Sequence, residues 1–184
     1  MSNVFTKDKQ NVKSFYEKNM DEIKGIFSKN SKLFNIEFDS KELSLILDQY
    51  CGLDYFLLSN KKVYGVAGRV NFNKYHHNHV TIRYKRKTGA LTEFQKRIAS
   101  IKNKSSEIYA NITMQIDAVD NKIKRAIIFE SDKLYMHIHN NLNLFENQYM
   151  LRNNFDGNLF FKINYLDIKR LSDKELFKVY IYKN

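Results

Sequence analysis

The chain has 184 residues, a length typical of one domain and sufficient to bury a full hydrophobic core. Hydrophobic residues make up 43% of it and charged residues 28%, which argues against disorder, and its single cysteine excludes a disulfide framework or a cysteine-rich metal site. It carries 31 Lys and Arg residues against 20 Asp and Glu residues, a net charge of +11. Because no run approaches about 18 apolar residues and the first residues form no apolar stretch, we expect no membrane span, no secretory signal and a cytoplasmic location.

Hydrophobic spacing predicts helices and strands along the chain. Apolar residues recur at helical spacing over 8–29, and Ser40 is the expected N-cap of a second helix over 41–50. Three strands should follow, the first two joined by a short hairpin loop over 59–62. A helix with Thr92 near its start should come next, and then a strand, a turn at 120–121, another strand, a short helix and two late strands. The predicted ranges are 53–58, 63–72, 80–86, 88–103, 108–119, 123–129, 131–140, 160–165 and 177–182.

This order of elements predicts an α+β, or mixed α/β, fold with a central twisted sheet. The strands over 53–58, 63–72 and 80–86 follow one another without a helix between them, so we expect them to be antiparallel. The helix over 88–103 should return the chain to the sheet. One domain is expected over 1–184, and its parts are an N-terminal helical extension over 1–35, a core over 40–118, and C-terminal strands and a helix over 119–184 that complete the sheet.

The positive charge is concentrated in the middle of the chain. The segment 60–104 holds twelve basic residues, and Glu93 is its only acid, so this quarter accounts for the whole net charge. Tyrosines and histidines are interleaved with these cations, a composition suited to base stacking and phosphate contact. We therefore predict a nucleic-acid-binding surface, with DNA favoured over RNA. Its expected residues are Lys61, Lys62, Lys74, Arg83, Lys85, Arg86, Lys87 and Arg97.

Part of this surface should lie on one strand. Thr81, Arg83 and Lys85 alternate with apolar neighbours and would share one strand face, where they could line a groove for a phosphate backbone. Such binding would depend strongly on salt. Two alternatives stay open: the basic segment could meet an acidic protein, or it could be a solvated sheet face.

Asp54 and Glu93 are the carboxylates that point to chemistry. Asp54 stands at the start of an apolar strand, where aspartate is disfavoured, and it could bind Mg²⁺ or cap the turn after Gly52. Glu93 and Lys96 are three residues apart on the predicted helix, so both can point the same way, as a site pair or as a surface ion pair. Gln115 could reach the same place.

These residues give the segment 40–118 a resemblance to the core of the PD-(D/E)XK nuclease superfamily. In that family an aspartate ends one strand, and an acid-x-lysine triplet follows on the next strand. Asp54 matches the aspartate and Arg69 matches the cation, but Ala67 stands where the family has an acid. The missing acid could come from Glu93, or from Glu42 or Asp48.

The resemblance implies a restriction-endonuclease-like fold and Mg²⁺-dependent phosphodiester cleavage. Asp54 and Glu93 would hold the metal, and Arg69 and Lys96 would stabilise the phosphate. A nuclease of a phage, plasmid or restriction system would fit this pattern. The alternative, which Ala67 favours, is a non-catalytic nucleic-acid-binding module or an inhibitor of a nucleoprotein defence complex.

The remaining candidates are weaker. His76, His77 and His79 are clustered, but only the last two would share a strand face and no cysteine lies near them, so zinc binding is not favoured. Cys51 has no identifiable base and is interpreted as a buried small hydrophobe. The sequence leaves a homodimer open.

Overall fold

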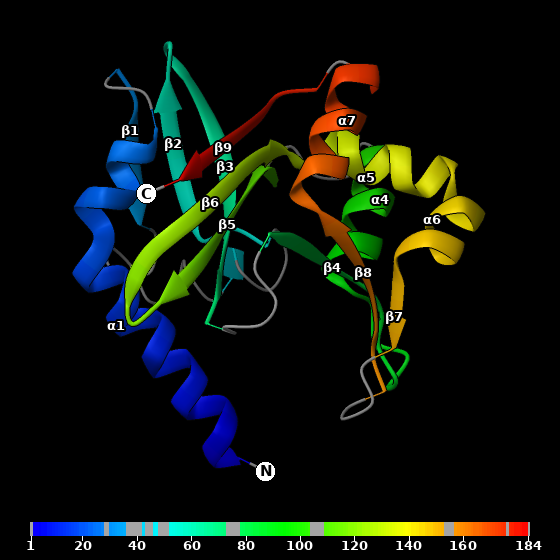
Figure 1. The fold of residues 1–184 in the computed structure, drawn as a ribbon, viewed down its shortest axis with the longest axis horizontal. Helices are drawn as coiled ribbons and strands as arrows, with labels where there is room; N and C mark the ends of the chain where they lie inside the picture. The colour runs from blue at the N-terminus through cyan, green and yellow to red at the C-terminus, as the bar shows by residue number, and fades with distance from the viewer. Residues whose placement is uncertain are drawn as a thin grey trace.

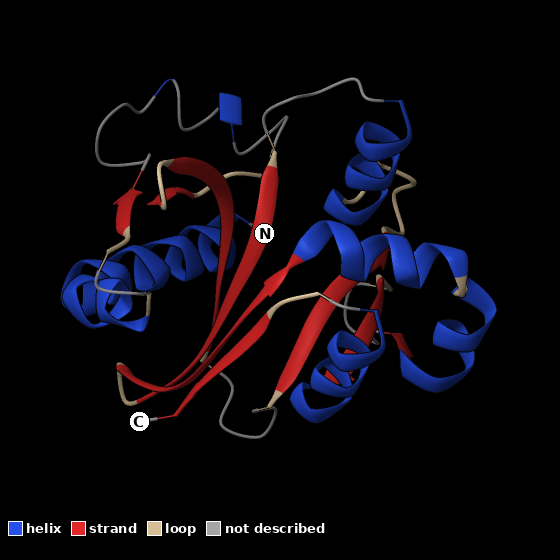
Figure 2. Cartoon of the chain, turned by 90° about the horizontal axis from the view of Figure 1, so that it is seen from above, coloured by secondary structure: helices blue, strands red, loops and turns tan. Residues whose placement is uncertain are grey.

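The computed structural model describes most of the chain. Its described residues are 2–27, 30–35, 42, 46–47, 52–72, 78–103, 109–152, 157–175 and 177–183. Together they form a mixed α/β structure with two sheets and helices on both sides of the strands (Figures 1 and 2).

The larger sheet, sheet A, has six strands. In spatial order they are β1 (Lys32–Asn35), β2 (Tyr55–Ser59), β3 (Lys62–Asn71), β5 (Ala110–Val119), β6 (Lys122–Glu130) and β9 (Val179–Lys183). β3 and β5 are parallel, and all other neighbours in this sheet are antiparallel. The chain travels between the two parallel strands through β4 and α4, so the connection contains a helix, as parallel strands require.

The smaller sheet, sheet B, consists of β4 (His79–Lys85), β8 (Leu159–Asn164) and β7 (Met150–Arg152), in that order and all antiparallel. The prediction that three consecutive strands would form one antiparallel meander is therefore wrong for the third strand. β4 does not join β3, because β5 occupies that edge of β3. Instead, β4 turns Val80 and Ile82 toward the apolar residues of β8 and of the helices.

The described helices lie on two sides of the strands. They are α1 (Ser2–Ile26), α4 (Glu93–Asn103), α5 (Ser131–Asn140), α6 (Leu142–Tyr149) and α7 (Tyr165–Glu175). Figure 2 shows α1 on one side of the strands and the other four helices on the opposite side. No helix in the described parts of the chain is long and apolar enough to cross a membrane.

Two main cores follow from this arrangement. In the first, Phe15, Tyr16 and Ile23 of α1 pack on one face of sheet A. In the second, the inner face of sheet B packs against α4–α7 and the end of β6. β5 lies between the two cores, and its residues Thr113 to Ala118 are all buried, because both of its faces are covered.

Local signals placed several elements correctly. The turn between β2 and β3 at Asn60 and Lys61, and the turn between β5 and β6 at Asp120 and Asn121, have positive φ at both central residues, as type I′ hairpins do. Thr92 caps α4, because its Oγ1 accepts the Gln95 backbone N–H while the Gln95 side chain accepts the Thr92 N–H. The two turns and the position of Thr92 near the helix start were predicted, although α4 begins only at Glu93.

Other elements were missed or lie elsewhere. α1 starts before the predicted range, and β1, α6, β7 and α7 were not predicted. α7 follows β8 without a loop, and Asn164 marks the change because its side chain accepts the Leu166 N–H at 2.9 Å. Of the helix predicted over 41–50, only residues 42 and 46–47 are described, and they are helical. Ser40 and Cys51 lie outside the described residues.

Candidate functional site

Asp54, Arg69 and Glu93 come together from three elements. Asp54 directly precedes β2, Arg69 lies on β3, and Glu93 is the first residue of α4. The Gly68 backbone N–H donates to Asp54 Oδ2 at 2.7 Å, and Arg69 Nη2 donates to Glu93 Oε2 at 2.5 Å. A Cβ at Gly52 would lie 3.3 Å from Glu93 Cγ, so the turn before Asp54 also packs against Glu93. Three of the four residues predicted for catalysis are thus neighbours.

The Arg69 guanidinium holds this cluster together electrostatically. The Glu93 carboxylate raises the pKa of Arg69, burial opposes that rise, and the charge of Asp54 adds to it more weakly. The second guanidinium nitrogen of Arg69 donates to the Thr81 carbonyl at 3.2 Å, which ties sheet A to β4. Arg69 is therefore a fixed cation that neutralises Glu93 and joins the two sheets.

The carboxylates fit a magnesium site poorly. Glu93 Oε2 is engaged by Arg69, and Glu93 Oε1 is buried with no hydrogen-bond partner among the described residues. Asp54 Oδ2 is engaged by the Gly68 N–H. Across the described part of the chain, no group of three His, Cys, Asp or Glu side chains is placed to hold a metal ion. Two carboxylates, one of them already paired with arginine, do not make a complete site for a dication.

The other residues of the predicted catalytic set lie nearby but do not complete it. Lys96 is exposed on α4, one turn after Glu93. Ala67 is buried with Leu47, Leu53 and Ala110 in a small apolar cluster, so the position at which the predicted resemblance called for an acid is buried and apolar. Of the two replacement acids, Glu42 is exposed and Asp48 lies outside the described residues.

The edge of β4 that faces away from β8 forms backbone hydrogen bonds with a row of polar side chains on the buried face of β5. Gln115 donates through Nε2 to the His79 carbonyl and accepts the Thr81 N–H at 3.3 Å. Arg69 binds the Thr81 carbonyl from the neighbouring strand. β4 is the edge strand of sheet B, so these side chains take the place of a neighbouring strand.

Asp117 is the polar residue of this row that sequence reasoning missed. It is fully buried, and it accepts hydrogen bonds from Asn71 Nδ2 at 3.1 Å, from the Asn78 N–H at 2.9 Å and from the Tyr165 hydroxyl at 3.1 Å. Burial, and then the charge of Asp117, raise the pKa of Tyr165, so this phenol remains a donor. The signal was an acid inside an apolar strand, the same signal that drew attention to Asp54.

The predicted basic surface is divided between two places. Lys61 and Lys62 lie at the β2–β3 turn, and Lys85 and Lys87 lie at the end of β4 with Arg86 between them. Figure 1 shows these two places at opposite ends of the molecule, the β2–β3 turn at the top and the end of β4 at the bottom. Lys74 lies outside the described residues.

Arg97 does not belong to either basic group. It is 3% exposed, and its guanidinium donates to the Ala110 carbonyl and, at 3.4 Å, to Asp132 Oδ1, while it lies 5.1 Å from the centre of the Tyr109 ring. The prediction that Arg97 forms part of an exposed binding surface is therefore wrong. Helical periodicity turns it inward, toward Ala110 at the start of β5 and toward Asp132 at the start of α5, which it neutralises.

The outer face of sheet B is basic and aromatic. Thr81 and Arg83 alternate with buried Val80 and Ile82, which confirms that these two share a face, whereas the register against β8 shifts between Arg83 and Lys85, an exposed residue at the end of β4. Strand pairing adds Phe160 opposite Arg83 and Lys162 opposite Thr81. The Arg83 guanidinium lies 5.4 Å from the centre of the Phe160 ring, in cation–π range.

The turn that follows β4 extends this face. The Lys87 backbone N–H donates to Asn158 Oδ1 at 3.1 Å, and the Lys87 side chain packs against Gly157, where a Cβ would lie 3.1 Å from Lys87 Cδ. These contacts hold the basic turn after β4 beside the start of β8.

His79 lies half-buried at the start of β4, and His76 and His77 lie outside the described residues.

Comparison of the chain with protein-family models, with curated proteins and with solved structures gives no match. The assignment of function therefore depends on the chemistry of these surfaces.

Proposed function

We propose that this protein binds nucleic acid through the outer face of sheet B, without catalysis. The observation that supports this most directly is the placement of Arg83 over Phe160, with Lys162 on the same face and the exposed Lys85 at the end of β4. A guanidinium in cation–π range of a ring can also contact a phosphate while its neighbours add charge, and the aromatic surface beside it suits stacking. Such a module could serve as an inhibitor of a nucleoprotein complex.

The surroundings of Asp54 favour binding over cleavage. Ala67 removes one acid of the PD-(D/E)XK pattern, and Arg69 neutralises Glu93, so the cluster has the geometry of a structural tie between sheets. The second candidate is a magnesium-dependent DNA or RNA endonuclease with a restriction-endonuclease-like core, in a phage, plasmid or restriction system. Its favouring observation is the meeting of Asp54, Arg69 and Glu93; Glu93 would have to leave Arg69 to bind metal.

The binding proposal predicts a salt-dependent loss when Arg83 and Lys85 are both replaced by Ala. Affinity for duplex DNA, measured by fluorescence anisotropy at low salt, should fall roughly tenfold or more, about 1.4 kcal/mol per factor of ten. The slope of log affinity against log salt should become shallower by about 1 for each phosphate contact removed.

The matched control removes two exposed lysines elsewhere. Lys122 and Lys124 lie at the β5–β6 turn and on β6, so replacing both by Ala gives the same change in net charge away from sheet B. Its affinity and salt slope should stay close to those of the unmodified protein. If the two double variants lost the same affinity for duplex DNA, binding would depend only on the net charge of the protein, and the proposed surface would be wrong.

The two candidate functions differ in their response to Asp54→Asn. This change keeps an oxygen that can accept the Gly68 N–H but removes the charge. Under the binding proposal, labelled DNA and RNA stay intact with Mg²⁺ or Mn²⁺, and chelator leaves affinity unchanged in both proteins. Metal-dependent cleavage that disappears in Asp54→Asn, while binding is retained, would establish the endonuclease instead.

A further inference from the structure

A groove of about 760 Å³ lies on the face of sheet A that α1 covers elsewhere. Its floor runs across four strands: Tyr64 on β3, Ile112 on β5, Ile128 on β6 and Tyr180 on β9. These side chains share a face, because Ile128 is paired with Tyr180 and Tyr64 lies two residues before Val66, the partner of Ile112.

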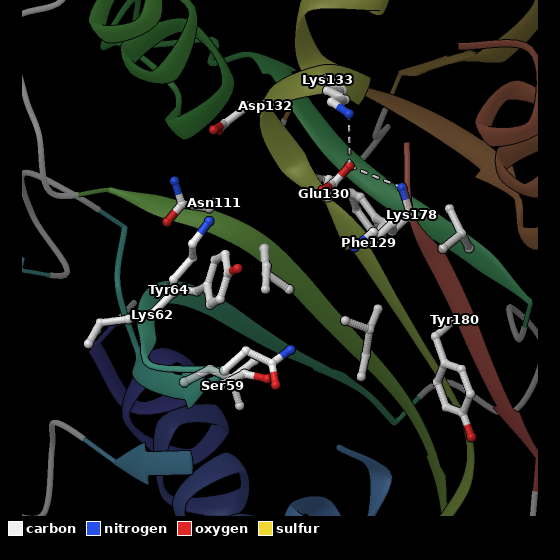
Figure 3. A pocket seen from close by; sticks show the side chains of 16 residues that line it. Ser59, Lys62, Tyr64, Asn111, Phe129, Glu130, Asp132, Lys133, Lys178 and Tyr180 are labelled. Atoms are coloured by element: carbon white, nitrogen blue, oxygen red, sulfur yellow. Dashed lines mark hydrogen bonds and ion pairs between the residues drawn. The ribbon is translucent and has the colours of Figure 1, made fainter. Parts of the chain in front are cut away.

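The two tyrosines stand on opposite sides of this apolar floor. Figure 3 shows Tyr64 beside Lys62 on one side and Tyr180 on the other. They lie three strand spacings apart across the sheet, about 14 Å, and are also offset along the strands, because the registers place Tyr180 level with Gly68, four residues after Tyr64 on β3. Tyr180 is 53% exposed, so its ring is available at the surface. A volume of this size is in the range of small-ligand sites, yet the groove is open along the sheet and suits an extended occupant.

The rim of the groove is cationic. Lys62, Lys133 and Lys178 line it, together with the acids Glu130 and Asp132. Glu130 is engaged by the Lys133 ammonium at 3.4 Å and by the Lys178 backbone N–H at 3.0 Å, as the dashed lines in Figure 3 mark.

Asp132 adds little negative charge to the groove. Arg97 lies behind it, with Nη1 at 3.4 Å from Asp132 Oδ1. Burial raises the pKa of Asp132, and Arg97 opposes that rise. The ion pairs Lys133–Glu130 and Arg97–Asp132 balance the two acids, so Lys62 and Lys178 give the rim its net positive charge.

We propose that this groove binds the unpaired nucleotides of a nucleic-acid strand. The inference rests on the proposed function and adds its substrate class: a strand with a single-stranded segment. Each tyrosine offers a face for one base, the aliphatic floor excludes water between them, and Lys62 and Lys178 meet the backbone phosphates. A duplex cannot do the same, because its bases are stacked on one another.

The groove also gives Lys62 a role that the outer face of sheet B does not. Lys62 lies at the β2–β3 turn, far from the end of β4, and it lines the groove. The two basic groups therefore serve two surfaces, one for backbone contact and one for unpaired bases.

The test compares Tyr180→Ala, Tyr180→Phe and Phe34→Ala on the full chain. Phe34 is a matched control, an aromatic residue on β1 that is 46% exposed and lies outside the groove. Affinities are measured by anisotropy for short labelled single strands of DNA and RNA and for a blunt duplex. Tyr180→Ala should weaken single-strand binding about tenfold and leave duplex binding unchanged, since stacking on one aromatic residue is of that order. Tyr180→Phe keeps the ring and should bind as the unmodified protein does, as should Phe34→Ala.

The outcomes separate this inference from the proposed function. If the unmodified protein binds neither strands nor duplex, the proposed function fails. A second outcome is that the protein binds duplex and the double variant Arg83→Ala, Lys85→Ala weakens that binding. If Tyr180→Ala then changes neither the single-strand affinity nor the duplex affinity, only the groove inference is overturned. A free mononucleotide that competes as well as the strand would show a nucleotide site and would also overturn it.

Discussion

Replacement of Gly65 by Ala is expected to lower the free energy of unfolding by about 3 kcal/mol, the upper end of the usual range for overpacking. Gly65 is buried on β3, and a Cβ there would lie 2.3 Å from Leu53 Cδ2 and 2.4 Å from the Tyr109 carbonyl oxygen. The second contact is with backbone, which cannot rotate away. Urea unfolding, followed by circular dichroism, measures the loss.

Gly65 also lies where the pairing of β3 with β5 changes register. The shift falls between Gly65 and Val66, and the Asn111 side chain accepts the Gly65 N–H at 3.2 Å. A side chain at this point would push the two parallel strands apart, and their separation would disturb the groove formed by Tyr64 and Ile112.

Gly25→Ala is the matched control for this prediction. Gly25 lies in the last turn of α1, and a Cβ there would meet nothing within 4 Å. Because alanine is favoured over glycine in a helix, this variant should gain up to about 1 kcal/mol. A Gly65→Ala protein as stable as Gly25→Ala would contradict the close packing of β3 against Tyr109.

Replacement of Asp117 by Ala should lower the free energy of unfolding by about 4 kcal/mol, because each buried donor left unsatisfied costs about 1–3 kcal/mol. The change leaves the hydrogen-bond donors of Asn71, Asn78 and Tyr165 without their acceptor at a buried position. It also removes a link between β5 and the start of β4, so sheet B would lose part of its attachment to sheet A. Thermal unfolding at neutral pH gives the change.

Two further variants grade this effect. Tyr165→Phe removes one donor and leaves the carboxylate its bonds to Asn71 and Asn78, so a loss of about 1 kcal/mol is expected. Asp173 is an exposed acid on α7, and its replacement by Ala should change stability by less than about 0.5 kcal/mol. If Asp117→Ala were as mild as Asp173→Ala, the polar row on β5 would not be the tie between the sheets.

The Asp117 prediction bears on function through sheet B. The edge of β4 is held by Gln115 and Arg69, and Asp117 anchors the chain just before it. The outer face with Arg83 and Phe160 is presented only when that edge is in place. A loss of binding in an Asp117 variant should therefore follow its loss of folded protein, whereas the Arg83 and Lys85 variant should lose binding while folded.

Several features could be predicted because neighbouring residues determine them. Asn60 and Lys61 allow the positive φ of a two-residue hairpin, and Thr92 with Gln95 makes a capping box whatever the rest of the chain does. The alternation of Val80 and Ile82 with Thr81 and Arg83 placed these two polar residues of β4 on one face. Asp54 and Glu93 were singled out as unusual carboxylates, and they do lie in one cluster with Arg69.

The sequence by itself thus determined the local elements, the concentration of positive charge and the unusual polar residues inside strands. Only the tertiary structure decided that β4 joins β8 instead of β3, that Arg97 turns inward to Asp132, and that Lys62 belongs to a groove with Tyr180. The physical reason is the sequence separation of the interacting residues, because turns, caps and alternation depend on residues a few positions apart. Strand pairing and the burial of a charge instead depend on which distant segments compete for the same edge or face.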